Sequence, residues 1–165
     1  LIQQLETRYG MFYIRLLRRY AVSIYEEGST FEIGKAVKVR DGSDVTIFAS
    51  GIMVDVALAA EEELRGKGIS ARVMNMFTLK PIDREAIVQC AGDTGAIVTA
   101  ENHNILNGLG SAVAEVLAEH CPTPMERVGV QDLFGEVGPE EYLRERFELT
   151  PEAIVRKVEK VLKRK

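Results

Sequence analysis

Residues 95–119 read GAIVTAENHNILNGLGSAVAEVLAE, a short apolar run followed by a polar tip and an amphipathic segment. The run Ala96–Ala100 has the length and β-branched content of a strand that is buried on both faces. After the tip at Glu101–Asn104, Gly108-Leu109-Gly110 opens a helix with one apolar face. Ligands and partners of open α/β sheets meet the carboxyl ends of the strands, so we expect a working surface at Glu101–His103.

The sequence on both sides of this stretch alternates between strand and helix patterns. Further strands are expected at 45–49, 69–77 and 126–130, and helices at 53–65, 83–91, 140–147 and from Pro151 onward. Ala36–Arg40 and Asp44–Ala49 flank Asp41-Gly42 as in a hairpin, with the first of them joining the sheet as an antiparallel edge. This pattern predicts an α/β fold, a three-layer α/β/α mostly parallel open sheet with an antiparallel edge strand.

Several side chains mark the ends and faces of the expected helices. Asp83 is a good N-cap, and Thr150 caps the last helix with Pro151 at its first position. On the helix at 53–65, Glu61–Glu63 are expected to be solvated. The pairs Glu61–Arg65 and Glu63–Lys67 have the favourable i, i+4 spacing.

Residues 1–35 have a different character from the rest of the chain. Leu1–Arg8 could end a helix, Phe12–Leu16 reads as a strand, and the following stretch to Ile33 lacks a clear period. A helix end and one strand cannot bury their apolar faces alone. We therefore interpret residues 1–35 as the tail of a preceding domain plus a linker, and residues 36–165 as the domain proper. An exposed apolar patch is expected near residues 11–25.

Composition excludes several functional classes. The 165 residues carry a net charge of −4, which argues against non-specific nucleic-acid binding. The basic residues within 157–165 are attributed to favourable charges at a helix C-terminus. No apolar run is long enough to span a bilayer. The two cysteines, Cys90 and Cys121, do not form a zinc motif, and Cys90 is expected to be a buried structural thiol of a cytoplasmic protein.

Three groups of residues are candidates for chemistry. Gly108 and Gly110 lack the third small residue of a dinucleotide fingerprint and are interpreted as a tightly packed helix start. His103 could be a base, a substrate contact or an interface residue, or could hydrogen-bond within its own loop. The arginines after the expected strand could grip a phosphate or could be a solvated strand end. These are Arg15, Arg18 and Arg19. We expect no complete catalytic constellation and no metal site.

The order of short segments along the chain resembles the C-terminal part of thiamine-diphosphate-dependent transketolases. The segments that carry the resemblance are GMFYIRL (10–16), FEIGKAV (31–37), DVTIFASG (44–51), LKPID (79–83), ENHN (101–104), GLGSAV (108–113), FGEVG (134–138) and LTPEAI (149–154). The first of them resembles the end of the family's pyrimidine-binding domain, and the others resemble its C-terminal domain. The similarity is closest to transketolases encoded as separate N- and C-terminal sections.

The resemblance implies a function in a larger assembly. The family moves a two-carbon ketol unit between sugar phosphates, using thiamine diphosphate and a divalent metal. The family's metal-binding motif is missing here, so the resemblance implies that this chain binds no cofactor alone and contributes no catalytic residue. Its partners would be an N-terminal transketolase section and a second copy in a homodimer. By resemblance, Arg18 sits where the family binds the substrate phosphate, and His103 is a second candidate substrate contact.

Two alternatives stay open at this point. The same domain occurs in deoxyxylulose-phosphate synthases and in 2-oxo acid dehydrogenase β subunits, where it would act in partner docking. A free-standing nucleotide-binding regulator is a third reading, and the poor glycine fingerprint counts against it.

Overall fold

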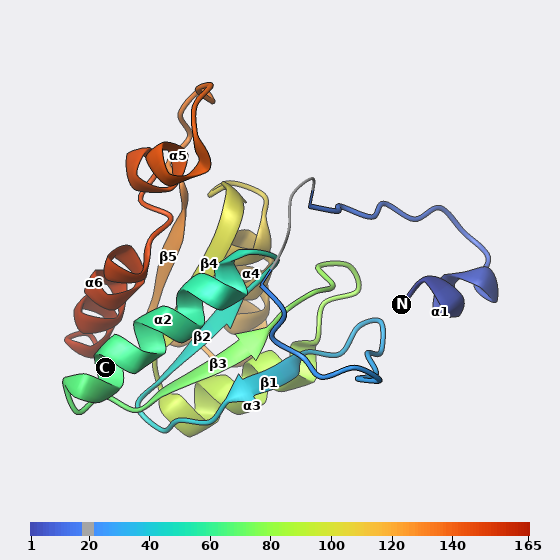
Figure 1. Cartoon of the computed structure of the whole chain (residues 1–165). Coiled ribbons are helices and arrows are strands. Elements are labelled where there is room, and N and C mark those ends of the chain that lie inside the picture. The colour runs from blue at the N-terminus through green and yellow to red at the C-terminus, as the bar shows by residue number, and fades with distance from the viewer. Residues whose placement is uncertain (18–21) are drawn as a thin grey trace.

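The computed structural model describes residues 1–17 and 22–165, which contain a five-stranded sheet (Figure 1). The strands are β1 (Val37–Arg40), β2 (Val45–Ala49), β3 (Ala71–Asn75), β4 (Ile97–Asn104) and β5 (Met125–Val130). They lie in the order β1-β3-β2-β4-β5. β2 pairs in parallel with β3 and β4, β4 pairs in parallel with β5, and β1 pairs antiparallel with β3. The expected mostly parallel sheet with an antiparallel edge strand is confirmed.

Helices cover both faces of this sheet. α2 (Met53–Gly66) and α6 (Pro151–Leu162) share one hydrophobic cluster with Ile47, whereas α3 (Arg84–Thr94) and α4 (Leu109–His120) share the other with Phe48. Ile47 and Phe48 are adjacent in β2 and point to opposite faces, so the two clusters form the outer layers of an α/β/α arrangement. Two short helices, α1 (Ile2–Glu6) and α5 (Glu140–Arg146), complete the described chain. None of the helices in residues 1–17 and 22–165 could cross a membrane.

Local signals fix the start of two covering helices as the sequence predicted. The Asp83 carboxylate accepts a hydrogen bond from the Ala86 N–H at 3.1 Å at the start of α3. The Thr150 hydroxyl accepts one from the Ala153 N–H at 3.3 Å at the start of α6, where Pro151 is the first helical residue. Both caps satisfy N–H groups that have no partner inside the helix.

Two expectations about the strands were wrong. β1 and β2 do not form a hairpin, because β3 lies between them and pairs with both. β4 does not end at Ala100 but continues through Asn104. The register shifts beyond Ala100, and Asn104 pairs with Val130 of β5, so pairing with a neighbour extends the strand through residues too polar to predict it.

Two expectations about the helices were also wrong. Glu61 is buried, with 6% of its surface exposed, because it shares the inner face of α2 with Ala57 and Leu64. Its carboxylate lies 3.9 Å from Arg65, whereas the pair at Glu63–Lys67 is closer, at 3.0 Å. α3 continues past Gly92 to Thr94 and ends at Gly95, which adopts the left-handed conformation of a helix C-cap (φ 62°).

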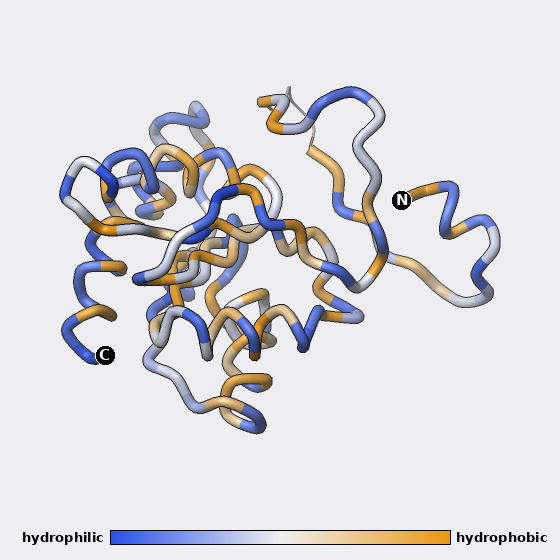
Figure 2. Tube along the Cα trace, turned by 90° about the horizontal axis from the view of Figure 1, so that it is seen from below, coloured by the Kyte–Doolittle hydropathy of each residue, from blue (hydrophilic) through white to orange (hydrophobic). Residues whose placement is uncertain are grey.

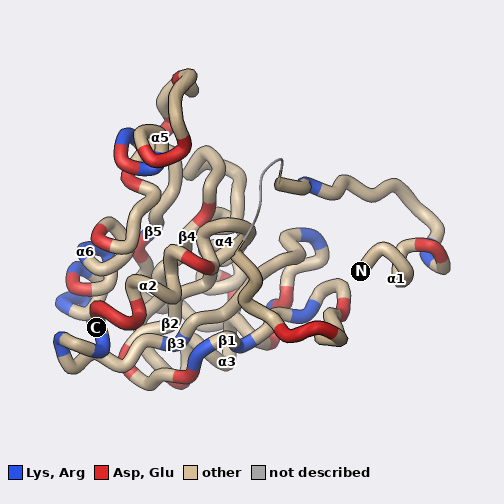
Figure 3. Tube along the Cα trace, viewed as in Figure 1, with Lys and Arg blue, Asp and Glu red and all other residues tan. Residues whose placement is uncertain are grey.

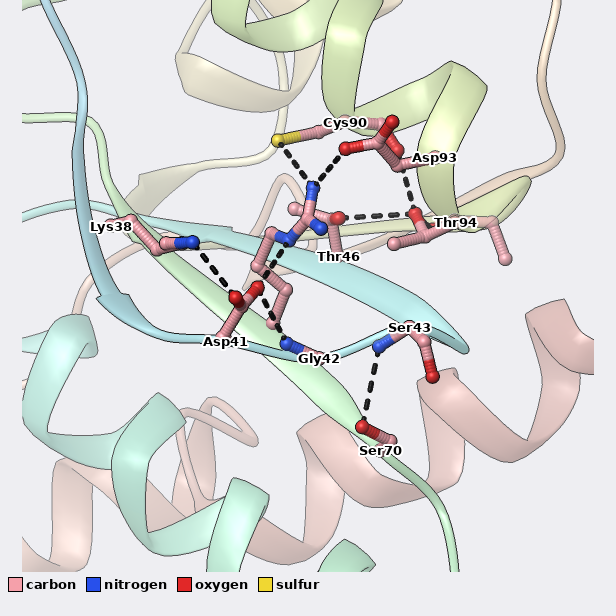
Figure 4. A network of polar contacts seen from close by, with 11 residues as sticks. Lys38, Asp41, Gly42, Ser43, Thr46, Ser70, Cys90, Asp93 and Thr94 are labelled. Carbon is pink, nitrogen blue, oxygen red and sulfur yellow. Dashed lines mark hydrogen bonds and ion pairs between the residues drawn. The ribbon is translucent and has the colours of Figure 1, made fainter.

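A polar network ties the turn after β1 to α3 (Figure 4). The Arg72 guanidinium of β3 lies 3.2 Å from Asp41, 2.7 Å from Asp93 and 3.6 Å from the Cys90 sulfur. The hydrogen bond to Asp93 outweighs burial and raises the pKa of Arg72. Cys90 is 4% exposed and packed in the core, so the expectation of a structural thiol is confirmed.

The N-terminal arm, residues 1–35, differs from the expected helix–strand tail. α1 forms, but Phe12–Leu16 is not a strand, because no neighbouring strand pairs with it. Figure 2 shows the first part of the arm lying beside the body, with several apolar stretches along it. Met11 and Tyr13 are almost fully exposed, which confirms the expected apolar patch at the start of the arm. The patch does not reach Ile24, which packs against the core.

Candidate functional site

The carboxyl end of β4 is where the sequence placed the working surface. Glu101 is 2% exposed there, and its carboxylate accepts two backbone hydrogen bonds from the start of α4. Oε2 accepts from the Leu109 N–H at 2.7 Å, and Oε1 accepts from the Gly110 N–H at 2.8 Å. A carboxylate at a helix N-terminus satisfies unpaired N–H groups and meets the positive end of the helix dipole. Glu101 is therefore a buried helix cap, which the sequence did not predict.

The two glycines of α4 make this cap possible. A Cβ built on Gly108 would lie 1.9 Å from Oε2 of Glu101, and one built on Gly110 would lie 2.7 Å from the Arg127 side chain. Both positions leave no room for a side chain next to the sheet. The interpretation of this pair as a tightly packed helix start, in place of a dinucleotide site, agrees with the structure.

His103 lies two residues beyond Glu101 and is half exposed, with 52% of its side chain accessible. Its Nδ1 is 2.8 Å from the Asn104 carbonyl oxygen and 4.0 Å from Oε2 of Glu101. The ring therefore makes the local hydrogen bond that the sequence left open beside a role as base, substrate contact or interface residue, and its side chain is half exposed. A role for His103 as a substrate contact remains a prediction.

Two asparagines that the sequence analysis did not single out organise the same edge. Asn102 accepts hydrogen bonds from the Arg15 guanidinium, through its backbone carbonyl at 3.1 Å and its side-chain oxygen at 3.4 Å. Asn104 donates to Asp132, which follows β5, at 3.0 Å. Asn102 and Asn104 alternate with Glu101 and His103 along β4, so the sequence pattern could have indicated that the two asparagines share one side of an extended strand. The tip of β4 thus joins the arm on one side and the loop after β5 on the other.

Of the three arginines that were candidates for binding a phosphate, only Arg15 lies within the described residues. Arg15 is engaged by Asn102, so it anchors the arm to the carboxyl edge of the sheet. Arg18 and Arg19 lie outside the described residues. The structure brings Arg15 to the same edge as His103 through their common neighbour Asn102.

The described carboxylates and histidines do not gather into a cluster of metal ligands. Among residues 1–17 and 22–165, no group of three or more His, Cys, Asp or Glu side chains is arranged to hold a metal ion. The buried carboxylate at the carboxyl edge, Glu101, already has both oxygens engaged by α4.

Comparison with known proteins gives a consistent result. The family model "Transketolase, C-terminal domain" matches residues 34–154. The chain is 56% identical over 156 residues to "6-deoxy-6-sulfo-D-fructose transketolase subunit SqwH" of Clostridium sp. (strain MSTE9), covering 94% of this chain and 48% of that protein. It is 41% identical over 158 residues to "Putative transketolase C-terminal section" of Methanocaldococcus jannaschii, covering 94% of this chain and 49% of that protein. The chain therefore spans about half the length of these curated relatives.

The fold also matches a solved structure, "Split gene transketolase, inactive beta4 tetramer". The TM-score is 0.86 and the identity is 47%, with 88% of this chain and 48% of that chain covered. The similarity therefore extends from the sequence motifs to the arrangement of the sheet and its helices.

Proposed function

This chain belongs to the transketolase C-terminal domain family, and on that premise we propose that it serves as the C-terminal section of a split transketolase. The assembled enzyme transfers a two-carbon ketol unit between sugar phosphates. Residues 1–35 are assigned to the end of the preceding pyrimidine-binding domain and its linker, and residues 36–165 to the C-terminal domain. The assembly is proposed to be a cytoplasmic homodimer of the complete enzyme.

The observation that carries this proposal is the exposed apolar segment at residues 11–17. Met11 is fully exposed, Tyr13 is 90% exposed and Leu16 is 77% exposed, although proteins normally bury Met and Leu and bury Tyr in part. Arg15 lies within the same segment and is anchored to Asn102. An anchored segment with a row of uncovered apolar side chains fits a surface that a partner covers. The partner proposed here is the N-terminal transketolase section.

Two side chains are proposed to face the substrate in the assembly. His103 is half exposed at the carboxyl edge of the sheet, and its imidazole can donate or accept a hydrogen bond. Arg18 follows the anchored Arg15 by three residues, and a guanidinium can bind a phosphate in a bidentate way. Both are binding residues in this proposal, and neither takes part in the bond-making steps.

The cofactor is proposed to be held elsewhere in the assembly. When bound, thiamine diphosphate supplies a stabilised carbanion, and a divalent metal holds its diphosphate. The contribution of this chain is to cover the partner, to exclude water from the junction and to place Arg18 and His103 at its rim. The isolated chain is therefore expected to show no transketolase activity and no saturable heat in a titration with thiamine diphosphate and magnesium.

A coupled assay with the N-terminal section added back tests the proposal. The mixture is expected to transfer a ketol unit from a ketose phosphate to an aldose phosphate, and neither component alone is expected to do so. Because a relative 56% identical is a 6-deoxy-6-sulfo-D-fructose transketolase subunit, that sulfosugar is the second donor to test. Turnover of a 2-oxo acid without turnover of either ketose would refute the proposal and favour the dehydrogenase or deoxyxylulose-phosphate synthase reading.

A further inference from the structure

A small pocket lies on the opposite side of β5 from β4, where α6 crosses the edge of the sheet. Its volume is about 260 Å³. Its lining includes Arg127, Gly129, Gln131, Arg156, Lys157 and Lys160. We refer to this site as the β5–α6 pocket. It falls just below the range of about 300 Å³ and more that is typical of sites for drug-sized ligands, so its size suits a small molecule.

The floor of the pocket is the open edge of β5. The carbonyls of Pro124 and Val130 accept hydrogen bonds from the β4 side, from Ile97 at 3.0 Å and Ile105 at 2.8 Å. Alternate residues of a parallel strand turn their backbone groups to the same side. Arg127, midway along β5, is out of phase with these two residues, so its N–H and C=O point to the open edge. The pocket therefore presents a backbone donor that no strand of this sheet covers.

Side chains close the two ends of this open edge. The Gly129 carbonyl accepts a hydrogen bond from the Gln131 side chain at 2.9 Å, and the Met125 carbonyl accepts one from Arg164 at 3.0 Å. Blocking the carbonyls of an edge strand hinders pairing with another strand. The same blocking leaves the N–H groups around Arg127 and the single carbonyl of Arg127 on the open edge, so donors outnumber acceptors there and the edge favours an acceptor such as an anion over another strand.

The wall of the pocket is strongly cationic. Three lining side chains of α6 are basic, Arg156, Lys157 and Lys160, and one lining side chain, Glu148, is acidic, which leaves an excess of two positive charges in a chain with a net charge of −4. Arg127 lines the pocket with its backbone, because its guanidinium donates to the Ile105 carbonyl at 3.0 Å. Figure 3 shows the basic residues of α6 spaced along the helix next to β5. Glu148 is occupied by Arg156, at 2.7 Å. A concave site with an excess of one sign concentrates ligands of the opposite sign.

The cations of the wall are held in place by a buried carboxylate. Glu126, whose side chain is 9% exposed, lies 3.2 Å from Lys157, 3.0 Å from Lys160 and 2.8 Å from Arg164. Three cations on one carboxylate leave two charges uncompensated. Glu126 therefore fixes the positions of Lys157 and Lys160 while neutralising only one of the three charges around it, which suits a preorganised anion site.

We propose that the β5–α6 pocket binds the phosphate group of a small organic phosphate. The β5 edge supplies backbone N–H donors from one side, and Arg156, Lys157 and Lys160 supply charged donors from the other. A tetrahedral dianion accepts hydrogen bonds from several directions at once, whereas a planar carboxylate carries less charge per group. The pocket volume leaves room for a few carbon atoms beyond the phosphate. This site does not depend on the transketolase assignment.

Amide-resolved NMR on the full 165-residue chain tests this proposal. Glycerol 3-phosphate and succinate are titrated separately at an ionic strength held constant with sodium chloride, since bulk screening must not vary. Glycerol 3-phosphate is expected to cause saturable shifts at the amides of Arg127, Gly129 and Lys157. Succinate is expected to bind at least tenfold more weakly. No saturable shift at these amides, or tighter binding of succinate, would overturn the proposal.

Paired variants make the test specific to the pocket. Arg156→Gln combined with Lys160→Gln removes two charged donors but leaves Lys157 and Arg164 on Glu126, and at least a tenfold loss of affinity is expected. Lys163→Gln removes a charge just beyond the end of the same helix and is expected to change affinity less than twofold. If the double variant does not fold, Arg156→Gln alone is expected to weaken binding at least threefold. Equal losses in the pocket and control variants would refute the assignment.

Discussion

Residues 45–49 and residues 12–16 are two apolar pentapeptides that the sequence presents as strands, and they differ completely in the structure. VTIFA forms β2, pairs on both edges and is buried at all five positions. FYIRL pairs with nothing in the described chain, and Tyr13 is 90% exposed. A run of apolar residues indicates that a strand is possible, but neighbouring strands and a covering layer are needed to form it. Residues 12–16 thus have the composition of a strand but lack neighbouring strands and a covering layer in the described chain.

The largest expected effect compares Ile47→Ala in β2 with Ile14→Ala in the arm. Ile47 is fully buried between α2, α6 and the sheet, so its truncation should lower the free energy of unfolding by about 4 kcal/mol. Ile14 is half exposed, and its truncation to Ala should alter the free energy of unfolding by less than about 0.5 kcal/mol. Urea denaturation of both variants measures the difference.

Adding the N-terminal section sharpens this comparison. If a partner covers the arm, Ile14→Ala should weaken association with that partner while leaving the isolated chain unchanged. Comparable destabilisation of the two isolated variants would mean that the arm packs on its own body, and the proposed docking role would then fail.

The second effect concerns glycines that differ in what surrounds them. Gly108→Ala places a methyl group against the buried Glu101 carboxylate and should cost about 3 kcal/mol, from overpacking and a disturbed cap. Gly135→Ala, in the loop before α5, has open space around the new methyl group and should change stability by less than about 0.5 kcal/mol. Thermal unfolding of the two variants checks this. A small effect at Gly108 would show that Glu101 can move away from α4.

These contrasts also show how far the sequence could be interpreted. The existence of β2 and β4, the edge position of β1 and the caps at Asp83 and Thr150 follow from local patterns of apolar and capping residues. The burial of Glu61 was missed because a charged residue was assigned to solvent by its type, although its spacing from Ala57 and Leu64 puts it on the inner face of α2. Strand β4 was predicted too short, since its last residues are polar and only their pairing reveals them.

The sequence placed Glu101 and His103 after the apolar run of β4, whereas the structure has them within the last part of that strand. The role of Glu101 could not be read from the sequence, because a carboxylate seven residues before a glycine is equally compatible with catalysis and with capping. The hydrogen-bond distance distinguishes the two roles: the Leu109 N–H lies 2.7 Å from the Glu101 carboxylate, so Glu101 caps α4. Similarly, the basic residues of 157–165 were attributed to the helix terminus, whereas three of them converge on Glu126 across the fold.

The third effect separates a buried carboxylate of the body from an exposed one of the arm. Glu101→Gln keeps the shape but removes the charge that faces two N–H groups, and its amide directs one donor toward them. A loss of about 2 kcal/mol is expected. Glu6→Gln, exposed at the end of α1, should change stability by less than about 0.5 kcal/mol. Equal unfolding midpoints in urea for these two variants would contradict the capping role.

The smallest expected effect is on the pH dependence of stability, to which a carboxylate of the body, Glu126, should contribute and an exposed carboxylate of the arm should not. Burial alone would raise the pKa of Glu126, but the hydrogen bonds and charges of Lys160 and Lys157 outweigh it and lower that pKa below its usual value of 4.5. A carboxyl whose pKa is lower in the folded state stabilises the fold above pH 4.5, and this stabilisation is lost as the pH falls through the folded pKa.

Glu126→Gln should therefore be less stable than the parent chain at pH 6, by about 1 kcal/mol, and the gap should close towards pH 3. The matched control is Glu27→Gln, which removes one exposed carboxylate of the arm and should keep the parent's pH dependence. Urea denaturation at both pH values distinguishes them. If Glu126→Gln kept the same gap at pH 3 as at pH 6, its carboxylate would contribute through packing alone, and the charge would have no part in holding α6 against β5.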